Sequence, residues 1–170
     1  MADGMKRVFQ TELGTVYVDD LEGLGTIRWE GNKAYKWVQR QPDGRWTDAL
    51  AGWCVKYFAD DGYLLNLVTP SAIDATESQH GAGVLTHTIP DSVIQAADYP
   101  YLWIQIRGSA TLSVAIEGSP TSDDCLTCDP DIAEHGAARK VSDLAQDRQD
   151  MYPDDGTAGA GTKVICNFVF

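Results

Sequence analysis

The sequence predicts a mainly β protein, either an antiparallel β-sandwich or a small β-barrel, with one short helix in a late insert. Short runs in which apolar and polar residues alternate recur along the chain, and turn-forming residues separate them. These runs correspond to about eight to ten strands. The length, 170 residues, is that of one domain with its own core, and no fixed repeat of solenoid or propeller type is present.

The pattern divides the chain into two parts. Residues 1–23 form an N-terminal arm with the first strand or strands, and residues 24–170 form a single β-rich domain. The run from Val8 to Val18 predicts one or two short strands interrupted near Gly14. The domain carries an insert at about residues 119–161, which is rich in Gly, Pro, Ser, Thr and Asp. Within this insert, near-helical spacing of apolar residues predicts a surface helix from Ile132 to Met151.

A hairpin is predicted from Gly25 to Gln39. A two-residue loop would mix polar and apolar residues on both faces, whereas the three-residue loop Gly31-Asn32-Lys33 would separate them. We therefore expect the longer loop, with Asn32 left-handed. This register places Ile27, Trp29, Tyr35 and Trp37 on one face and Arg28, Glu30, Ala34 and Lys36 on the other.

Further strands are predicted over residues 51–58, 64–68, 82–89 and 163–170. The clearest run, Tyr99 to Ile116, predicts a central hairpin with the loop Gly108-Ser109-Ala110. In that register six aliphatic residues share one buried face, and Pro100 stands at the strand's first residue because it lacks an N–H donor. The six are Leu102, Ile104, Ile106, Leu112, Val114 and Ile116.

Charge restricts the classes of partner. Thirteen Lys and Arg stand against 25 Asp and Glu, a formal net charge of -12. We therefore expect no direct nucleic-acid partner, since phosphate binding needs a basic face. No apolar run approaches a membrane span and no secretory signal pattern opens the chain, so we expect no membrane partner and synthesis in a reducing cytoplasm.

Reactive residues are few and scattered. Cys125 and Cys128 have a metal-like spacing but lack the second ligand pair that structural zinc requires, so no metal, cofactor or catalytic residue is predicted. A disulfide between these two cysteines is the alternative. Cys54 and Cys166 lie on predicted strands, where cysteine acts as a small apolar residue. The three histidines, His80, His87 and His135, have no catalytic context, and no nucleophile elbow or phosphate loop is present.

Aromatic residues are the other candidate site. They would serve as a sugar-stacking platform or line a core or subunit interface, and their alternation with polar residues on strands favours the second interpretation. Our interface candidates are Val8, Phe9, Trp29, Tyr35, Trp37, Tyr101 and Trp103.

The order of four segments resembles a known family. GTIRWEGNKAYKWVQ, AGWCVKYF, AGVLTHTI and YPYLWIQIRGSATLSV follow one another between residues 25 and 114, and an apolar strand closes the chain after a variable insert. In this the chain resembles the decoration, or cement, proteins of tailed-bacteriophage heads. The resemblance implies a non-enzymatic virion protein on the outer capsid surface that bridges subunits of the major capsid protein.

The resemblance further implies a small homo-oligomer at a capsid symmetry axis, with a trimer favoured over a dimer. The segment from Met1 to Leu13 is a candidate to add a strand to a neighbouring chain. Two other functions stay open: a carbohydrate-binding β-sandwich module that uses exposed Trp and Tyr, and a cysteine- or zinc-dependent enzyme.

Overall fold

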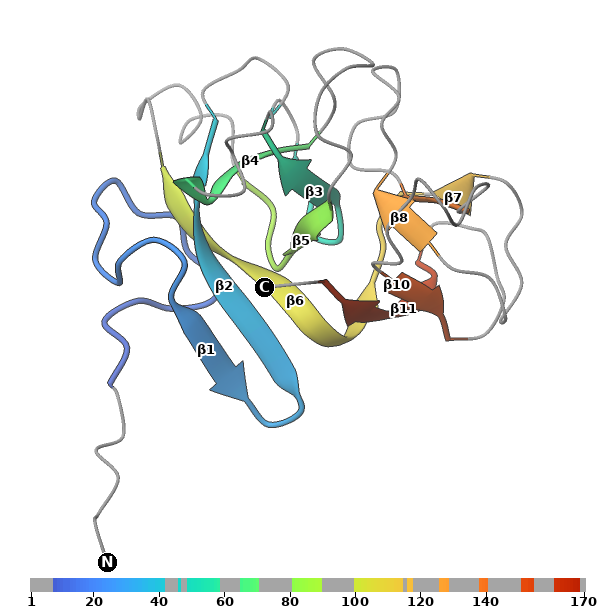
Figure 1. The fold of residues 1–170 in the computed structure, drawn as a ribbon, viewed down its shortest axis with the longest axis horizontal. Helices are drawn as coiled ribbons and strands as arrows, with labels where there is room; N and C mark the ends of the chain where they lie inside the picture. Colours follow the sequence, from blue (N-terminus) through green and yellow to red (C-terminus); the bar gives the residue numbers. More distant parts are fainter. Residues whose placement is uncertain are drawn as a thin grey trace, which may run out of the picture.

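The computed structural model confirms a mainly β protein, and the strands of its described part belong to one sheet (Figure 1). The structure describes residues 8–41, 46, 49–58, 65–70, 81–89, 100–114, 116–117, 126–128, 138–140, 151–154 and 161–168. Within these ranges, no helix has the length and apolar character needed to cross a membrane.

Eleven strands occur in the described residues. In chain order they are β1 (Ile27–Glu30), β2 (Lys33–Arg40), β3 (Cys54–Tyr57), β4 (Leu67–Thr69), β5 (Gly81–Leu85), β6 (Tyr101–Thr111), β7 (Ile116–Glu117), β8 (Leu126–Cys128), β9 (Ala138–Lys140), β10 (Met151–Pro153) and β11 (Lys163–Asn167).

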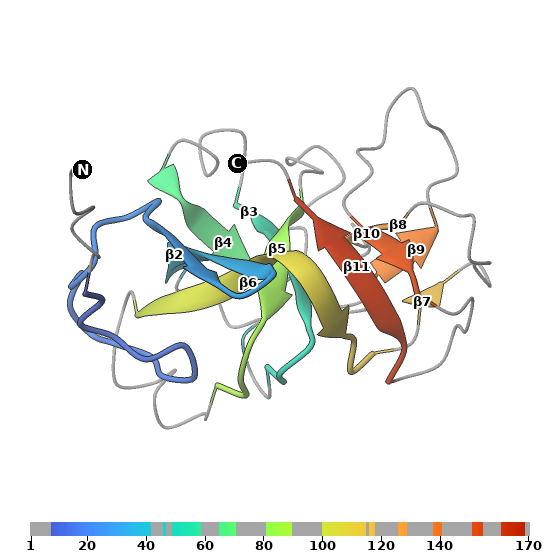
Figure 2. The ribbon, with the colours of Figure 1, turned by 90° about the horizontal axis from the view of Figure 1, so that it is seen from below.

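Five of the strands close into a barrel. The hydrogen-bonded order β2–β4–β3–β5–β6 returns to its start because β2 also pairs with β6. β1 extends the sheet from β2, while β11, β10, β8, β9 and β7 follow β6 on the other side of the barrel (Figure 2). Most pairs are antiparallel as predicted, but β2 pairs with β4, and β7 with β9, in parallel.

The predicted central hairpin is wrong, because β6 continues as one strand through the expected loop. Gly108 adopts a φ of 88°, and a Cβ at this position would lie 2.8 Å from the backbone oxygen of Asn32. Only glycine fits there, and β6 passes at this point from pairing with β2 to pairing with β11. The alternation still identified buried residues: Leu102, Ile104, Ile106 and Leu112 are all in the core.

The β1–β2 hairpin is confirmed, but its loop is one residue shorter than predicted. Glu30 pairs with Lys33, which leaves Gly31 and Asn32 as the loop. Gly31, not Asn32, takes the positive φ, at 60°, as in a type II′ turn. The predicted separation of the two faces is therefore also wrong.

The N-terminal residues form no strand between Val8 and Val18, where one or two were predicted. They make a single bridge, Tyr17 to Tyr101, and otherwise pack on the sheet through side chains. The arm, blue in Figure 1, covers the outer face of β2 and β6.

The helix predicted from Ile132 to Met151 is wrong wherever the structure describes that segment. Ala138–Lys140 forms β9, which pairs with β8, and Met151 begins β10. Ala138 and Met151 are fully buried in the core, so these residues are held by the strand ladder and by core packing. The insert thus adds strands to the sheet instead of a surface helix.

The remaining strand predictions are confirmed in place and type. β3, β4, β5 and β11 fall within or beside the predicted runs. In β11 the alternation is exact for Val164, Cys166 and Phe168, which are buried; Phe170 lies outside the described residues.

Candidate functional site

A second core lies between the arm and the outer face of the barrel. Its buried members are Tyr35 and Trp37 of β2 and Trp103 of β6, and we call them, with the partly buried Phe9, Leu13, Tyr17 and Tyr101, the aromatic cluster. Trp37 stacks on Tyr101 with ring centroids 6.1 Å apart, and Phe9 meets Trp103 edge-on at 5.6 Å. These contacts combine large buried area with favoured ring geometry.

Both buried indole N–H groups of the cluster donate to the arm. Trp37 Nε1 donates to Asp20 Oδ1 at 2.7 Å, and Trp103 Nε1 donates to Thr11 Oγ1 at 2.8 Å. A buried Trp normally requires such a partner. The arm therefore both covers the aromatic cluster and supplies the acceptors for its two buried indole N–H groups.

Glu22 holds the arm's two ends together. Its Oε1 accepts hydrogen bonds from Gln10 N at 2.6 Å, Thr11 N at 2.9 Å and Thr11 Oγ1 at 2.8 Å. The side chain is buried, so these donors supply much of what water would otherwise give the carboxylate.

Arg28 fastens the arm from the β1 side. Its Nη1 donates to the backbone oxygen of Thr11 at 2.8 Å, and its guanidinium lies 5.0 Å from the ring centre of Phe9. Nη2 forms an ion pair with Glu30 on the same strand. The arm from Phe9 to Glu22 is thus a built part of the fold.

The arm, Leu24 after it, and the segment just before β4 expose aliphatic side chains beside carboxylates. We define the arm surface as Val18, Asp19, Leu21, Leu24 and Leu65, whose aliphatic members are 37% to 72% exposed. Leu24 and Leu65 belong to adjacent segments, since a Cβ on Gly25 would lie 3.0 Å from Asn66 Nδ2. Residues 8–26 contain four acidic residues and no Lys or Arg, so this surface is acidic as well as apolar.

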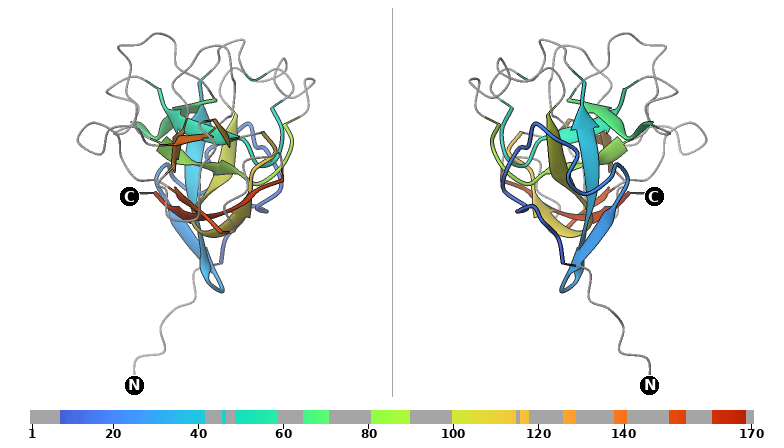
Figure 3. Two further views of the ribbon diagram at one scale, coloured as in Figure 1. Left: turned by 90° about the vertical axis from the view of Figure 1, so that its right-hand side faces the viewer. Right: turned by 90° about the vertical axis from the view of Figure 1, so that its left-hand side faces the viewer.

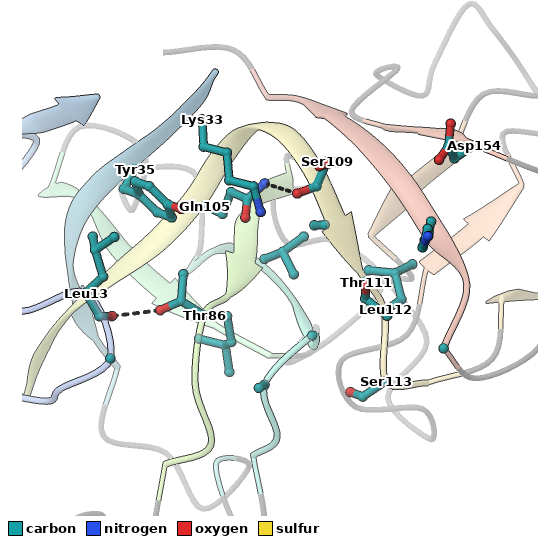
Figure 4. Close-up of a pocket in the computed structure, with 18 residues that line it drawn as sticks. Leu13, Lys33, Tyr35, Thr86, Gln105, Ser109, Thr111, Leu112, Ser113 and Asp154 are labelled. Carbon is teal, nitrogen blue, oxygen red and sulfur yellow. Dashed lines mark hydrogen bonds between the residues drawn. The ribbon is translucent and has the colours of Figure 1, made fainter. Parts of the chain in front are cut away.

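A groove of about 730 Å³ runs beside the aromatic cluster, between the end of the arm and the bent part of β6 (Figure 4). Gln105 lies in it, and its Nε2 donates to the backbone oxygen of Ser109 at 2.8 Å. Lys33, Lys163 and Asp154 also line it, together with several hydroxyl groups. The lining is mixed: aliphatic side chains stand beside hydroxyl groups and charges of both signs.

Tyr35 is the one aromatic residue among the described residues that line the groove. It is only 8% exposed, so its ring offers no open face for stacking. Burial raises the pKa of its hydroxyl, the nearby Glu30 raises it further, and Arg28 opposes the shift. The hydroxyl therefore stays protonated at neutral pH.

The seven interface candidates are placed in three settings. Val8 and Trp29 are well exposed, at 83% and 53%. Phe9 and Tyr101 are partly buried in the aromatic cluster. Tyr35, Trp37 and Trp103 are buried within the chain itself, beneath the arm. That any of them contacts another chain stays a prediction.

The cysteine and histidine predictions are tested only in part. Cys54 and Cys166 are buried, as expected of small apolar side chains. Cys125, His80 and His135 lie outside the described residues, as does the side chain of Cys128. In the part of the chain that is described, no three His, Cys, Asp or Glu side chains gather as they would around a metal ion.

His87 is the one histidine in the described ranges. Its Nδ1 lies 3.2 Å from Thr86 Oγ1, and burial lowers the pKa of the ring.

Two groups of polar residues were not foreseen from the sequence. Glu22 closely follows Asp19 and Asp20 in the sequence, and nothing in the local pattern distinguishes it from them. Lys36, Arg40 and Lys56 are buried cations of the barrel strands. Lys36 Nζ donates to the Tyr57 hydroxyl at 2.8 Å, and burial lowers the pKa of this amine. The predicted alternation had placed Lys36 on the face opposite Tyr35 and Trp37 without indicating that it is buried.

Comparison of the chain with protein-family models, with curated protein sequences and with solved structures finds no match in any of the three.

Proposed function

We propose that this chain is a structural protein of a tailed-phage head, which binds the outer surface of the assembled capsid and bridges subunits of the major capsid protein. The observation that supports this function is the arm surface, where exposed aliphatic side chains stand among carboxylates in a segment, residues 8–26, that contains no Lys or Arg. The order of the strand segments, which resembles that of capsid decoration proteins, supplies the identity of the partner.

The chemistry of the arm surface fits a basic protein surface with apolar pockets. The formal net charge of -12 keeps the free protein soluble and speeds its approach to a positively charged partner. Val18 and Leu21 then supply apolar area for the docked state, at about 25 cal/mol per Å² removed from water.

The anchoring of the arm makes this surface ready for docking. Glu22, Trp37 and Trp103 hold the segment through hydrogen bonds before any partner arrives. Little backbone entropy is then lost on binding, which favours affinity. Because the protein would bind the assembled shell and not its separate subunits, it would stabilise the shell by mass action.

Strand addition by the whole segment Met1–Leu13 receives less support, because Phe9 to Leu13 already pack against the chain's own barrel. Carbohydrate binding is likewise less supported. Stacking on sugars requires open ring faces, and of the five tryptophans only Trp29 is well exposed.

The test is cosedimentation of the purified chain with assembled heads that lack it, followed by imaging of the particles. We expect density outside the shell and a higher temperature of shell disassembly. The variant Val18→Ser/Leu21→Ser should weaken binding by about tenfold or more. The matched variant Ile165→Ser, which changes an exposed aliphatic residue of β11, should bind as the wild type does. Equal binding by all three proteins, or no binding by any, would contradict the proposal.

A further inference from the structure

β1 is an edge strand whose outer side has no partner strand among the described residues. It stands at one end of the strand order and pairs only with β2. The β1–β2 hairpin projects from the barrel, and no other strand of the described part of the chain lies along its outer side (Figure 3). Trp29, at 53% exposed, is the largest exposed side chain of the described residues.

The ladder leaves the backbone groups of Ile27 and Trp29 directed outward. Trp37 N donates to the Thr26 carbonyl, so this carbonyl points toward β2, while Thr26 N donates to the Gly23 carbonyl. Antiparallel strands alternate this direction residue by residue, so Arg28 and Glu30 also face β2, while Ile27 and Trp29 face away. β1 thus offers the N–H and C=O of two residues to a further strand.

We propose that β1 pairs antiparallel with β1 of a second copy of this chain, about a two-fold axis through Trp29. In that register each Trp29 stands opposite Trp29 of the second copy and exchanges two backbone hydrogen bonds with it. Arg28 then stands opposite Glu30 of the second copy, and Glu30 opposite its Arg28. The sequence Arg-Trp-Glu is therefore self-complementary in charge when it is paired antiparallel with itself.

The order of charges in Arg28-Trp29-Glu30 favours a second copy of this chain as the partner of β1. A charged edge strand normally resists pairing with an arbitrary strand, because like or unmatched charges meet across the ladder. Here both cross-pairs join opposite charges in the closely spaced, non-hydrogen-bonded positions of the ladder. Arg28 already pairs with Glu30 inside the chain, and the second copy would add a second ion pair at each end.

Trp29 supplies the apolar part of the proposed contact. The Arg107 guanidinium lies 5.6 Å from the ring centre of Trp29. Two such rings, meeting at the axis, would bury apolar area that the single chain exposes. The interface is isologous, so it closes with two copies and yields a dimer rather than the trimer that the family resemblance favours.

Pairing through β1 is a property of the isolated protein and requires no capsid partner. Sedimentation equilibrium of the full chain should therefore report twice the 18.5 kDa of one chain over a concentration series. Glu30→Lys places Lys opposite Arg28, and Arg28→Glu places Glu opposite Glu30. Each variant alone should raise the dimer dissociation constant at least tenfold. An equimolar mixture of the two should restore wild-type affinity, because both cross-pairs then join opposite charges.

Two further variants keep the result interpretable. Asp154→Lys makes a like charge change on an exposed acid that follows β10, on the other side of the barrel from β1, and it should dimerise as the wild type does. Trp29→Asp changes an exposed side chain, so it should fold normally yet be monomeric, since two carboxylates would meet at the axis. Arg28→Glu could release the arm, because Arg28 donates to Thr11. In that case Trp29→Asp is the variant to use.

Four outcomes would overturn β1 pairing: a wild type that stays monomeric at every concentration, a trimer, Glu30→Lys with unchanged affinity, or Trp29→Asp that still dimerises. A monomer that binds phage heads would overturn this inference alone. A dimer that binds no heads would support it and contradict the proposed function.

Discussion

The two faces of β2 are both buried, but different parts of the chain cover them. The outer face carries Tyr35 and Trp37, which the arm covers, and the indole N–H of Trp37 donates to Asp20 in the arm. The inner face carries Lys36, Val38 and Arg40, which the barrel encloses. On β2, the aromatic residues thus lie outside the barrel and the cations lie inside it, which is the reverse of what the alternation alone suggests.

This difference shows that alternation locates two faces without saying which of them meets water. Lys36 reaches across the barrel to Tyr57 of β3, a strand that is not its neighbour in the ladder. Its aliphatic stem packs in the interior while its amine has a hydroxyl acceptor. Trp37 is hidden only because a segment that precedes it in sequence folds back over it.

The largest expected effect is on the outer face. Trp103→Ala removes the centre of the aromatic cluster and should lower the free energy of unfolding by about 3–5 kcal/mol, measured by urea denaturation. Trp103→Phe keeps most of the packing and loses the hydrogen bond to Thr11, so it should cost less than half as much. A loss below about 1 kcal/mol for Trp103→Ala would show that the arm contributes little to stability.

Glu22→Ala should come next, because it leaves the N–H groups of Gln10 and Thr11 without their acceptor. We expect a loss of about 2–3 kcal/mol and faster hydrogen exchange confined to the arm. Glu22→Gln keeps one oxygen acceptor and should lose about 1 kcal/mol. The exposed Glu12→Gln serves as the control and should change stability by less than about 0.5 kcal/mol. Exchange that rises evenly over the whole chain would contradict a local role.

A smaller effect of opposite sign is expected on the inner face. Lys36→Met removes a buried amine and should stabilise the protein by about 1 kcal/mol at pH 7. Because burial lowers the pKa of Lys36, the unfolded chain binds this proton more tightly, so wild-type stability should rise with pH from the folded pKa toward 10.5. Lys36→Met should lose that rise, while Lys33→Met should keep it. A destabilised Lys36→Met would mean that the Tyr57 contact outweighs the burial of charge.

The smallest effect concerns His87, beside the groove. Burial lowers the pKa of this ring, so below its ordinary value of 6.5 the unfolded chain takes up a proton that the folded chain does not. Wild-type stability should therefore fall as the pH drops from 7 toward 5.5, whereas His87→Gln should be flatter over this window. Urea midpoints at matched pH values measure the difference. Parallel curves for the two proteins would assign the acid sensitivity to the carboxylates.

Strand positions were well predicted where the side-chain period is unbroken. The alternation of Val164, Cys166 and Phe168 gave β11, and that of Leu102 to Ile106 gave the buried face of β6. The path of β6 was mispredicted at Gly108, because a glycine flanked by small residues resembles a loop. Only the contact with the Asn32 carbonyl shows that this glycine bends a continuing strand.

The candidate surfaces were predictable to a lesser degree. Trp29 was singled out as an interface residue; it is exposed on an edge strand, and its contact with another chain stays a prediction. The arm surface was not foreseen, because the exposure of Leu21 and Leu24 depends on how Asp20 and Glu22 anchor the turns around them. Those hydrogen bonds join residues up to 12 positions apart, beyond the reach of a local pattern.

By itself, the sequence determined the β class, most strand positions, the acidic charge and the buried aliphatic stripes, because these depend on side-chain period and composition. Tertiary structure alone decided that β2 closes the barrel on β6, that the arm buries Trp37 and Trp103, and that Lys36 points inward. The physical reason is that strand pairing and burial depend on which distant segments meet. The local pattern specifies that a face is to be covered, and only the folded chain specifies what covers it.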